Sequence, residues 1–138
     1  MFRLLWLAVW VAALHVSVLA GPPDTTKPTV DIRGSHNDES LKKHLPANGV
    51  IVSQKGWEQL AKAWGIPDPP KVDFSKEILI VCTTVGSGLN VKVHVDDQGD
   101  LKVTAISTLD LGPGFRYVIK SVSREGVKTV NGKELPKE

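Results

Sequence analysis

Residues 77–84, EILIVCTT, form the most apolar stretch of the chain after residue 20. Residues 78–82 are apolar at every position, which is typical of a strand that is buried on both faces. The stretch therefore predicts a central strand lying between two other layers. Cys82, the only cysteine, sits in it. It has no partner for an internal disulfide, and we expect a small buried hydrophobic residue rather than a nucleophile.

One amphipathic helix is predicted ahead of this strand, over residues 53–64. Ser53 is a natural N-cap, and Gly65 followed by prolines ends the pattern. Apolar residues recur at the i, i+3, i+4, i+7 spacing of one helix face. They are Trp57, Leu60, Ala61 and Trp64. We interpret the two tryptophans as core anchors that dock the helix onto a sheet, rather than as a ligand platform.

The rest of the chain favours strands joined by tight turns. Residues 89–95 alternate between apolar and polar side chains, residues 97–100 have turn chemistry, and residues 101–107 return as the hairpin partner. The Asn131-Gly132 pair is the strongest short hairpin signal. Further strands are expected at residues 29–32, 50–52, 115–120 and 127–130. We predict an α+β fold of about six mostly antiparallel strands, in a sandwich or barrel, with the one helix.

The N-terminal region predicts export. Arg3 precedes an apolar run that reaches Ala20, where small residues form a cleavage site. This pattern is typical of a secretory signal peptide over residues 1–20. Residues 21–28 are then a flexible tether, and residues 29–138 a single domain. We expect an exported protein, located in the periplasm or outside the cell.

Two N-terminal elements of the domain are predicted from local signals. The strand at residues 29–32 should end at Gly34-Ser35, because glycine and serine favour turns. Asp38 should begin one or two helical turns within the polar residues 36–45.

The charge balance excludes some classes of partner. The chain has 17 basic and 15 acidic residues, without the clustered lysine and arginine that nucleic acid or an anionic membrane would need. We therefore expect no nucleic acid partner, and no membrane association once the signal peptide is removed.

Motifs for chemistry are weak. The Gly86-Ser87-Gly88 run lacks the lysine and helix of a phosphate-binding loop, and no catalytic pattern is present, so we expect no enzyme and no cofactor. One alternative stays open, a small-ligand or metal site. It would use His36, His44 and the three aspartates of residues 96–100, although turn stabilisation by Asp and Gly explains those aspartates equally well.

Two loops are the candidate contact surface, residues 86–90 and residues 109–115. The second contains LGPGF, a shaped turn that presents Leu111 and Phe115 to a partner. In the alternative interpretation, Phe115 folds back into the core. The candidate binding residues are Ser87, Asn90, Leu111, Pro113, Phe115 and Arg116.

Four segments resemble the C-terminal domain of PrcB-type protease-complex subunits: 50–53 (VIVS), 57–60 (WEQL), 70–76 (PKVDFSK) and 78–81 (ILIV). The Gly-Gly-Tyr-like segment of that family is replaced by GSGLN at residues 86–90. Residues 123–133 resemble instead a tail of uncharacterised exported proteins from planctomycete-type bacteria.

The resemblance to the PrcB family implies a shared β-rich fold and an accessory role without catalytic residues. We therefore expect a non-catalytic interaction module, accessory to or inhibitory toward a protease. Its expected partner is an exported protease or an envelope protein. The alternatives are the small-ligand or metal-binding protein and a structural envelope protein. The sequence leaves the oligomeric state open.

Overall fold

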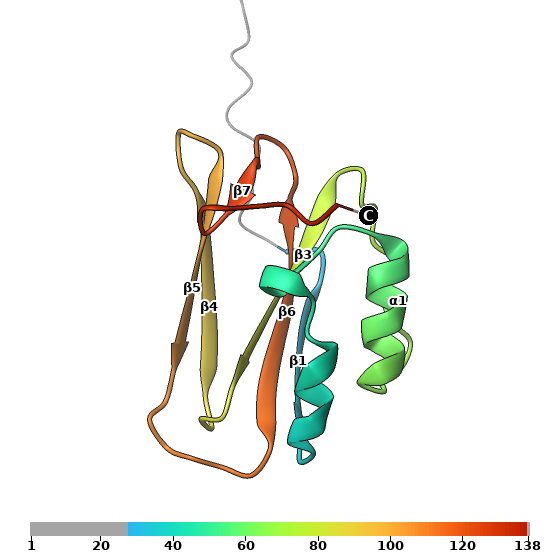
Figure 1. Cartoon of the computed structure of the whole chain (residues 1–138), viewed down its shortest axis with the longest axis vertical. Coiled ribbons are helices and arrows are strands. Elements are labelled where there is room, and N and C mark those ends of the chain that lie inside the picture. The colour runs from blue at the N-terminus through green and yellow to red at the C-terminus, as the bar shows by residue number, and fades with distance from the viewer. Residues whose placement is uncertain (1–27, 138) are drawn as a thin grey trace, which may run out of the picture.

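The computed structural model describes residues 28–137, so the predicted signal peptide and all but the last residue of the predicted tether lie outside the described residues. Eight strands, one α-helix and two short 3-10 helices make up this part of the chain (Figure 1). In chain order they are β1 (Asp31–His36), η1 (Glu39–His44), η2 (Ala47–Gly49), β2 (Val50–Ile51), α1 (Gln54–Ala63), β3 (Glu77–Thr84), β4 (Leu89–Val95), β5 (Asp100–Ser107), β6 (Phe115–Ser123), β7 (Thr129–Val130) and β8 (Lys133–Glu134).

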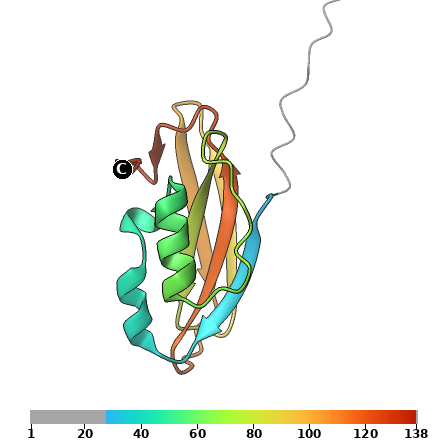
Figure 2. The same ribbon diagram turned by 90° about the vertical axis from the view of Figure 1, so that its right-hand side faces the viewer.

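The strands form two four-stranded sheets. The central sheet has the order β1-β6-β3-β2 and is antiparallel throughout; the outer sheet has the order β4-β5-β7-β8, with one parallel pair, β5 and β7. Figure 2 shows α1 and η1 together on one side of the sheets. The α+β, mostly antiparallel prediction is confirmed.

β3 lies between two layers, as its continuous apolar run predicts. Leu79 and Val81 belong to the cluster under the helices, whereas Ile78 and Ile80 belong to the cluster between the sheets. Each of these four side chains is at most 3% exposed. Cys82 is half-buried against the inter-sheet cluster, and this burial raises the pKa of its thiol. The thiol is therefore less nucleophilic than an exposed one.

α1 matches its predicted position and orientation. The Ser53 side chain accepts a hydrogen bond from Gly56 N–H at 3.1 Å, and Trp64 is the C-cap. The indole N–H groups also have partners: Trp57 donates to the Pro70 carbonyl and Trp64 to the Leu41 carbonyl, both at 3.0 Å. The tryptophans are thus core residues with their polar atoms satisfied.

The prediction for the first strand was wrong. β1 runs through Gly34 and Ser35 to His36 instead of ending before them. Gly34 lies opposite Tyr117 of β6, and a Cβ on Gly34 would come within 2.4 Å of the Tyr117 ring. The glycine therefore makes room for an aromatic ring that lies across β1, and does not break the strand.

The predicted turn after Asp38 is present, but it is a 3-10 helix. The Asp38 carboxylate accepts from Ser40 N–H at 2.9 Å and begins η1. Within residues 28–137, we find no helix with the length and apolar character needed to cross a membrane.

Candidate functional site

The two candidate loops meet at one end of the molecule. Residues 85–88 join β3 to β4, and residues 108–114 join β5 to β6, so both connect the outer sheet to the central sheet at the bottom of Figure 1. Backbone hydrogen bonds tie them together: Gly112 N–H donates to the Val85 carbonyl at 3.1 Å, and Thr108 N–H donates to Gly88 at 3.1 Å. We call this end of the molecule, residues 85–88 with 108–114, the loop face.

Side chains add a second set of bonds across the loop face. The Asp110 carboxylate accepts from Ser87 N–H at 3.0 Å, and the Thr108 hydroxyl accepts from Gly88 N–H at 2.9 Å. Hydrogen bonds from Ser87 and Thr108 hold the pKa of Asp110 far below its usual range. The carboxylate is therefore ionised at every physiological pH and fixes one loop against the other.

Gly86 makes the close approach of the loops possible. A Cβ at this position would lie 2.4 Å from the Thr108 carbonyl oxygen. The absence of a side chain at Gly86 therefore lets residues 85–88 pack directly against Thr108.

Two leucines on the loop face point into solvent. Leu109 is 99% exposed and Leu111 is 85% exposed, more than any other large apolar residue in the described chain. Water around such side chains is released when a partner covers them. The loops that carry them are held by the bonds described above, so little ordering is required on binding.

The other predicted site residues do not all belong to this surface. Ser87 and Pro113 are exposed on the loops, and Asn90 is exposed at the start of β4. Phe115, however, is 0% exposed and packs against His36 and Trp64, with ring centroids 5.4 Å away in each case. Its predicted role as a presented contact residue is wrong; the core alternative holds.

Arg116 lies beneath the loop face and is partly buried. Its Nη1 is shielded from solvent and has no hydrogen-bond partner among residues 28–137. The guanidinium group packs against Gly112, where a Cβ would be 3.0 Å from Nη1. Arg116 also lines an open pocket of about 480 Å³ together with Arg33, Ser35 and Ser87. The side chain thus supports the loop face from below and places a cation beside it.

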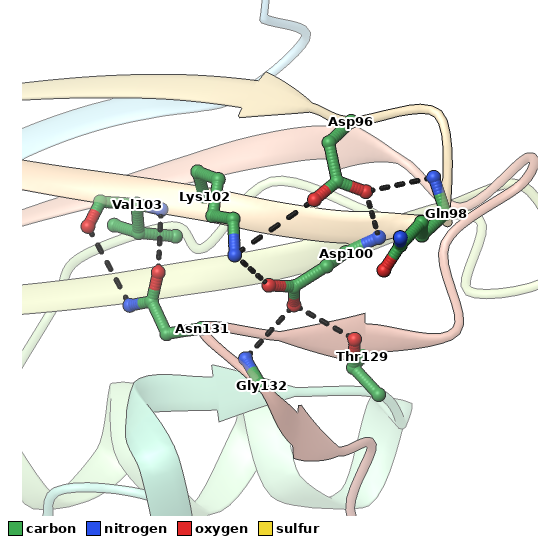
Figure 3. Close-up of polar contacts among 8 residues, drawn as sticks. All are labelled: Asp96, Gln98, Asp100, Lys102, Val103, Thr129, Asn131 and Gly132. Atoms are coloured by element: carbon green, nitrogen blue, oxygen red, sulfur yellow. Dashed lines mark hydrogen bonds and ion pairs between the residues drawn. The ribbon is translucent and has the colours of Figure 1, made fainter.

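The aspartate-rich turn serves the fold at the opposite end of the β4–β5 hairpin (Figure 3). Asp96 accepts from the N–H groups of Gln98 and Asp100, both at 2.9 Å. Asp100 accepts from the Lys102 ammonium, from the Thr129 hydroxyl at 2.7 Å and from Gly132 N–H at 2.9 Å. These bonds join the β4–β5 turn to the β7–β8 hairpin, and we call this end the aspartate junction.

The bonds of the aspartate junction also favour the ionised form of Asp100. The Lys102 side chain, then Gly132 N–H and the Thr129 hydroxyl, lower the pKa of Asp100 to about 2. Both carboxylate oxygens of Asp100 accept hydrogen bonds from groups of the chain itself.

The histidines of the possible metal site are placed apart from these aspartates. His36 stacks on Tyr117 with 5.4 Å between ring centroids and lies 5.9 Å from Trp64, within the aromatic cluster below η1 and α1. His44 is exposed. In the described range 28–137, no three His, Cys, Asp or Glu side chains group in a way that would hold a metal ion.

Sequence reasoning identified the two loops but missed Asp110 and Thr108, which join them. Their roles depend on contacts 20 and 23 residues away in the chain, and no local signal indicates such a pairing. In comparisons with known proteins, no family model, curated protein or solved structure gives a significant match to this chain. The resemblance to PrcB-type subunits therefore stays a prediction.

Proposed function

We propose that this protein is a non-catalytic interaction module that binds a protein partner through the loop face. The observation that carries the proposal is the exposure of Leu109 and Leu111, at 99% and 85%, on loops that hydrogen bonds hold in place. Fully burying one leucine contributes about 1.5–3 kcal/mol. Two such side chains on a fixed loop supply the apolar centre of a small interface.

The fixed loops favour binding by limiting its entropic cost. A flexible loop loses conformational freedom when it docks, whereas Asp110 already ties residues 108–112 to Ser87 before any partner arrives. Arg33 and Arg116 line the open pocket beside the loop face, so a partner whose carboxylates reach this pocket would complement the surface.

We infer that the partner belongs to the exported compartment. The signal-peptide pattern at residues 1–20 supports export, and the resemblance to PrcB-type subunits favours an exported protease or an envelope protein. The protein would then act as an accessory or inhibitory subunit, with the chemistry carried out by its partner.

The test is capture of envelope proteins by the wild-type protein and by a variant carrying Leu109→Ser and Leu111→Ser. We expect the double variant to lose on the order of 100-fold in affinity, because both apolar anchors are removed. Leu45→Ser is the matched control, since Leu45 is an exposed leucine, at 38%, outside the loop face. A partner bound equally well by the double variant would contradict the proposal.

A further inference from the structure

The first edge of the outer sheet is protected by basic side chains. β4 forms this edge. Arg33 donates from Nη1 to the Leu89 carbonyl at 3.2 Å, and Lys120 donates from Nζ to the Val91 carbonyl at 3.1 Å. Charged side chains that occupy edge carbonyls block the addition of another strand.

The far side of β5 is covered over only half its length. β7 pairs with the first two residues of β5, Asp100 and Leu101. The Asn131 side chain occupies the backbone groups of Val103, the next residue of β5 whose groups face this side. Its Oδ1 accepts from Val103 N–H at 2.8 Å, and its Nδ2 donates to the Val103 carbonyl at 3.5 Å. Beyond Val103, the described part of the chain places no strand on this side of β5, opposite β4.

The free half of β5 directs backbone groups into solvent. Thr104 and Ile106 lie opposite Lys92 and Asn90 of β4. Because backbone groups alternate in direction along a strand, Ala105 and Ser107 point their N–H and C=O groups to the same side as Val103. Donors and acceptors at two alternate residues thus lie along an open edge.

The side chains of this half-edge do not discourage pairing. Residues 103–109, VTAISTL, contain no charged residue and no proline, the two devices that commonly protect edge strands. Ile106, in the middle of the stretch, is 53% exposed. The β4 edge is guarded and the β5 half-edge is not.

We propose that β5 pairs antiparallel with β5 of a second copy of this chain, about a two-fold axis at Ile106. In this register, Ala105 lies opposite Ser107 of the second copy and exchanges both backbone hydrogen bonds with it. Ile106 lies opposite its own counterpart at a non-hydrogen-bonded position, where side chains approach most closely. The two sheets then continue into one.

A second copy fits this edge for three reasons. The register uses the free groups of Ala105 and Ser107 and leaves the bonds between Val103 and Asn131 intact. An uncharged stretch meets itself without like-charge repulsion. A two-fold pair also closes, because both copies use the same half-edge, and so it does not continue into a filament.

This inference goes beyond the proposed function and does not depend on it. The pairing uses the backbone groups of Ala105 and Ser107, whereas the partner contact uses the side chains of Leu109 and Leu111. Loss of either property leaves the other measurable.

Sedimentation over a range of concentrations tests the proposal. We expect the wild type to dimerise, and Ile106→Lys or Ile106→Glu to raise the dimer dissociation constant at least about tenfold, because like charges then face each other on the axis. An equal mixture of the two variants should recover association as a heterodimer. The matched control is Thr104→Glu, on the same strand face, which lies opposite the uncharged Thr108 of the second copy.

Thermal unfolding verifies that each variant is folded. We expect each to fold, because Ile106 is exposed and its replacement removes little packing. A wild type that stays monomeric up to about 1 mM would overturn the proposal, since even weak pairing is detectable at that concentration. Dimers unaffected by Ile106→Lys, or a mixture that does not recover association, would equally overturn it.

Discussion

The two ends of the β4–β5 hairpin are each held by an aspartate carboxylate, but they differ in the apolar surface that they expose. At the aspartate junction, Asp100 accepts bonds from Lys102, Thr129 and Gly132. At the loop face, Asp110 accepts from Ser87. In both places a carboxylate fastens two chain segments that are distant in sequence, and in both its pKa is lowered.

The ends differ in what they leave exposed. At the aspartate junction the nearby apolar residues Leu101 and Val130 are buried between the sheets, so the fold itself already covers their apolar surface. At the loop face, Leu109 and Leu111 remain in water. A fixed loop alone does not favour a partner; unburied apolar surface on a fixed loop does.

The largest expected effect is a difference in stability between substitutions in the core and on the loop face. Phe115→Ala should lower the free energy of unfolding by about 3–5 kcal/mol, because it empties a fully buried site. Leu111→Ala, four residues earlier, should change it by less than about 0.5 kcal/mol. Urea unfolding of both variants measures the difference. Similar losses for the two would mean that Leu111 is also a core residue.

The sequence predicted those elements whose signals are local. The helix stripe from Trp57 to Trp64 and the alternation of residues 89–95 each depend on neighbours within one element, and both are confirmed. The Asn131-Gly132 turn between β7 and β8 is equally local.

The errors concern residues whose roles depend on distant partners. Gly34 resembles a strand breaker until Tyr117 is placed over it. Phe115 follows a turn that resembles a display loop, but the aromatic cluster of β1 and α1 encloses it. The parallel pairing of β5 with β7 and the bond between Ser87 and Asp110 likewise join segments with no local signal for each other.

The second prediction concerns the pH dependence of the stability that the aspartate junction provides. Asp100 has a folded pKa of about 2, below its ordinary value of 3.8. Its bonds therefore stabilise the fold fully above about pH 4, and this contribution is lost as the pH falls toward 2. Asp100→Asn should unfold more easily than the wild type at pH 7.

The difference in the free energy of unfolding between the wild type and Asp100→Asn should decrease steadily below pH 4. Denaturant unfolding at several pH values measures it. A gap that stays constant between pH 7 and pH 2 would show that the charge of Asp100 contributes nothing to the junction.

A smaller and more local effect is expected at the loop face. Asp110→Ala should leave the melting temperature nearly unchanged but raise hydrogen exchange at the Ser87 amide by about tenfold or more, because Ser87 N–H loses its acceptor on the other loop. The Gly132 amide in the aspartate junction is the internal control. Equal acceleration at Gly132 would indicate global destabilisation and would contradict a local role for Asp110.

Hydrogen exchange of the protein with and without its captured partner tests the central claim most directly. We predict that the partner protects residues 85–88 and 108–114, while exchange at residues 96–100 and 129–132 is unchanged, because of these two ends it is the loop face that leaves large apolar side chains, Leu109 and Leu111, in water. Protection concentrated at the aspartate junction, with the loop face unaffected, would contradict this account.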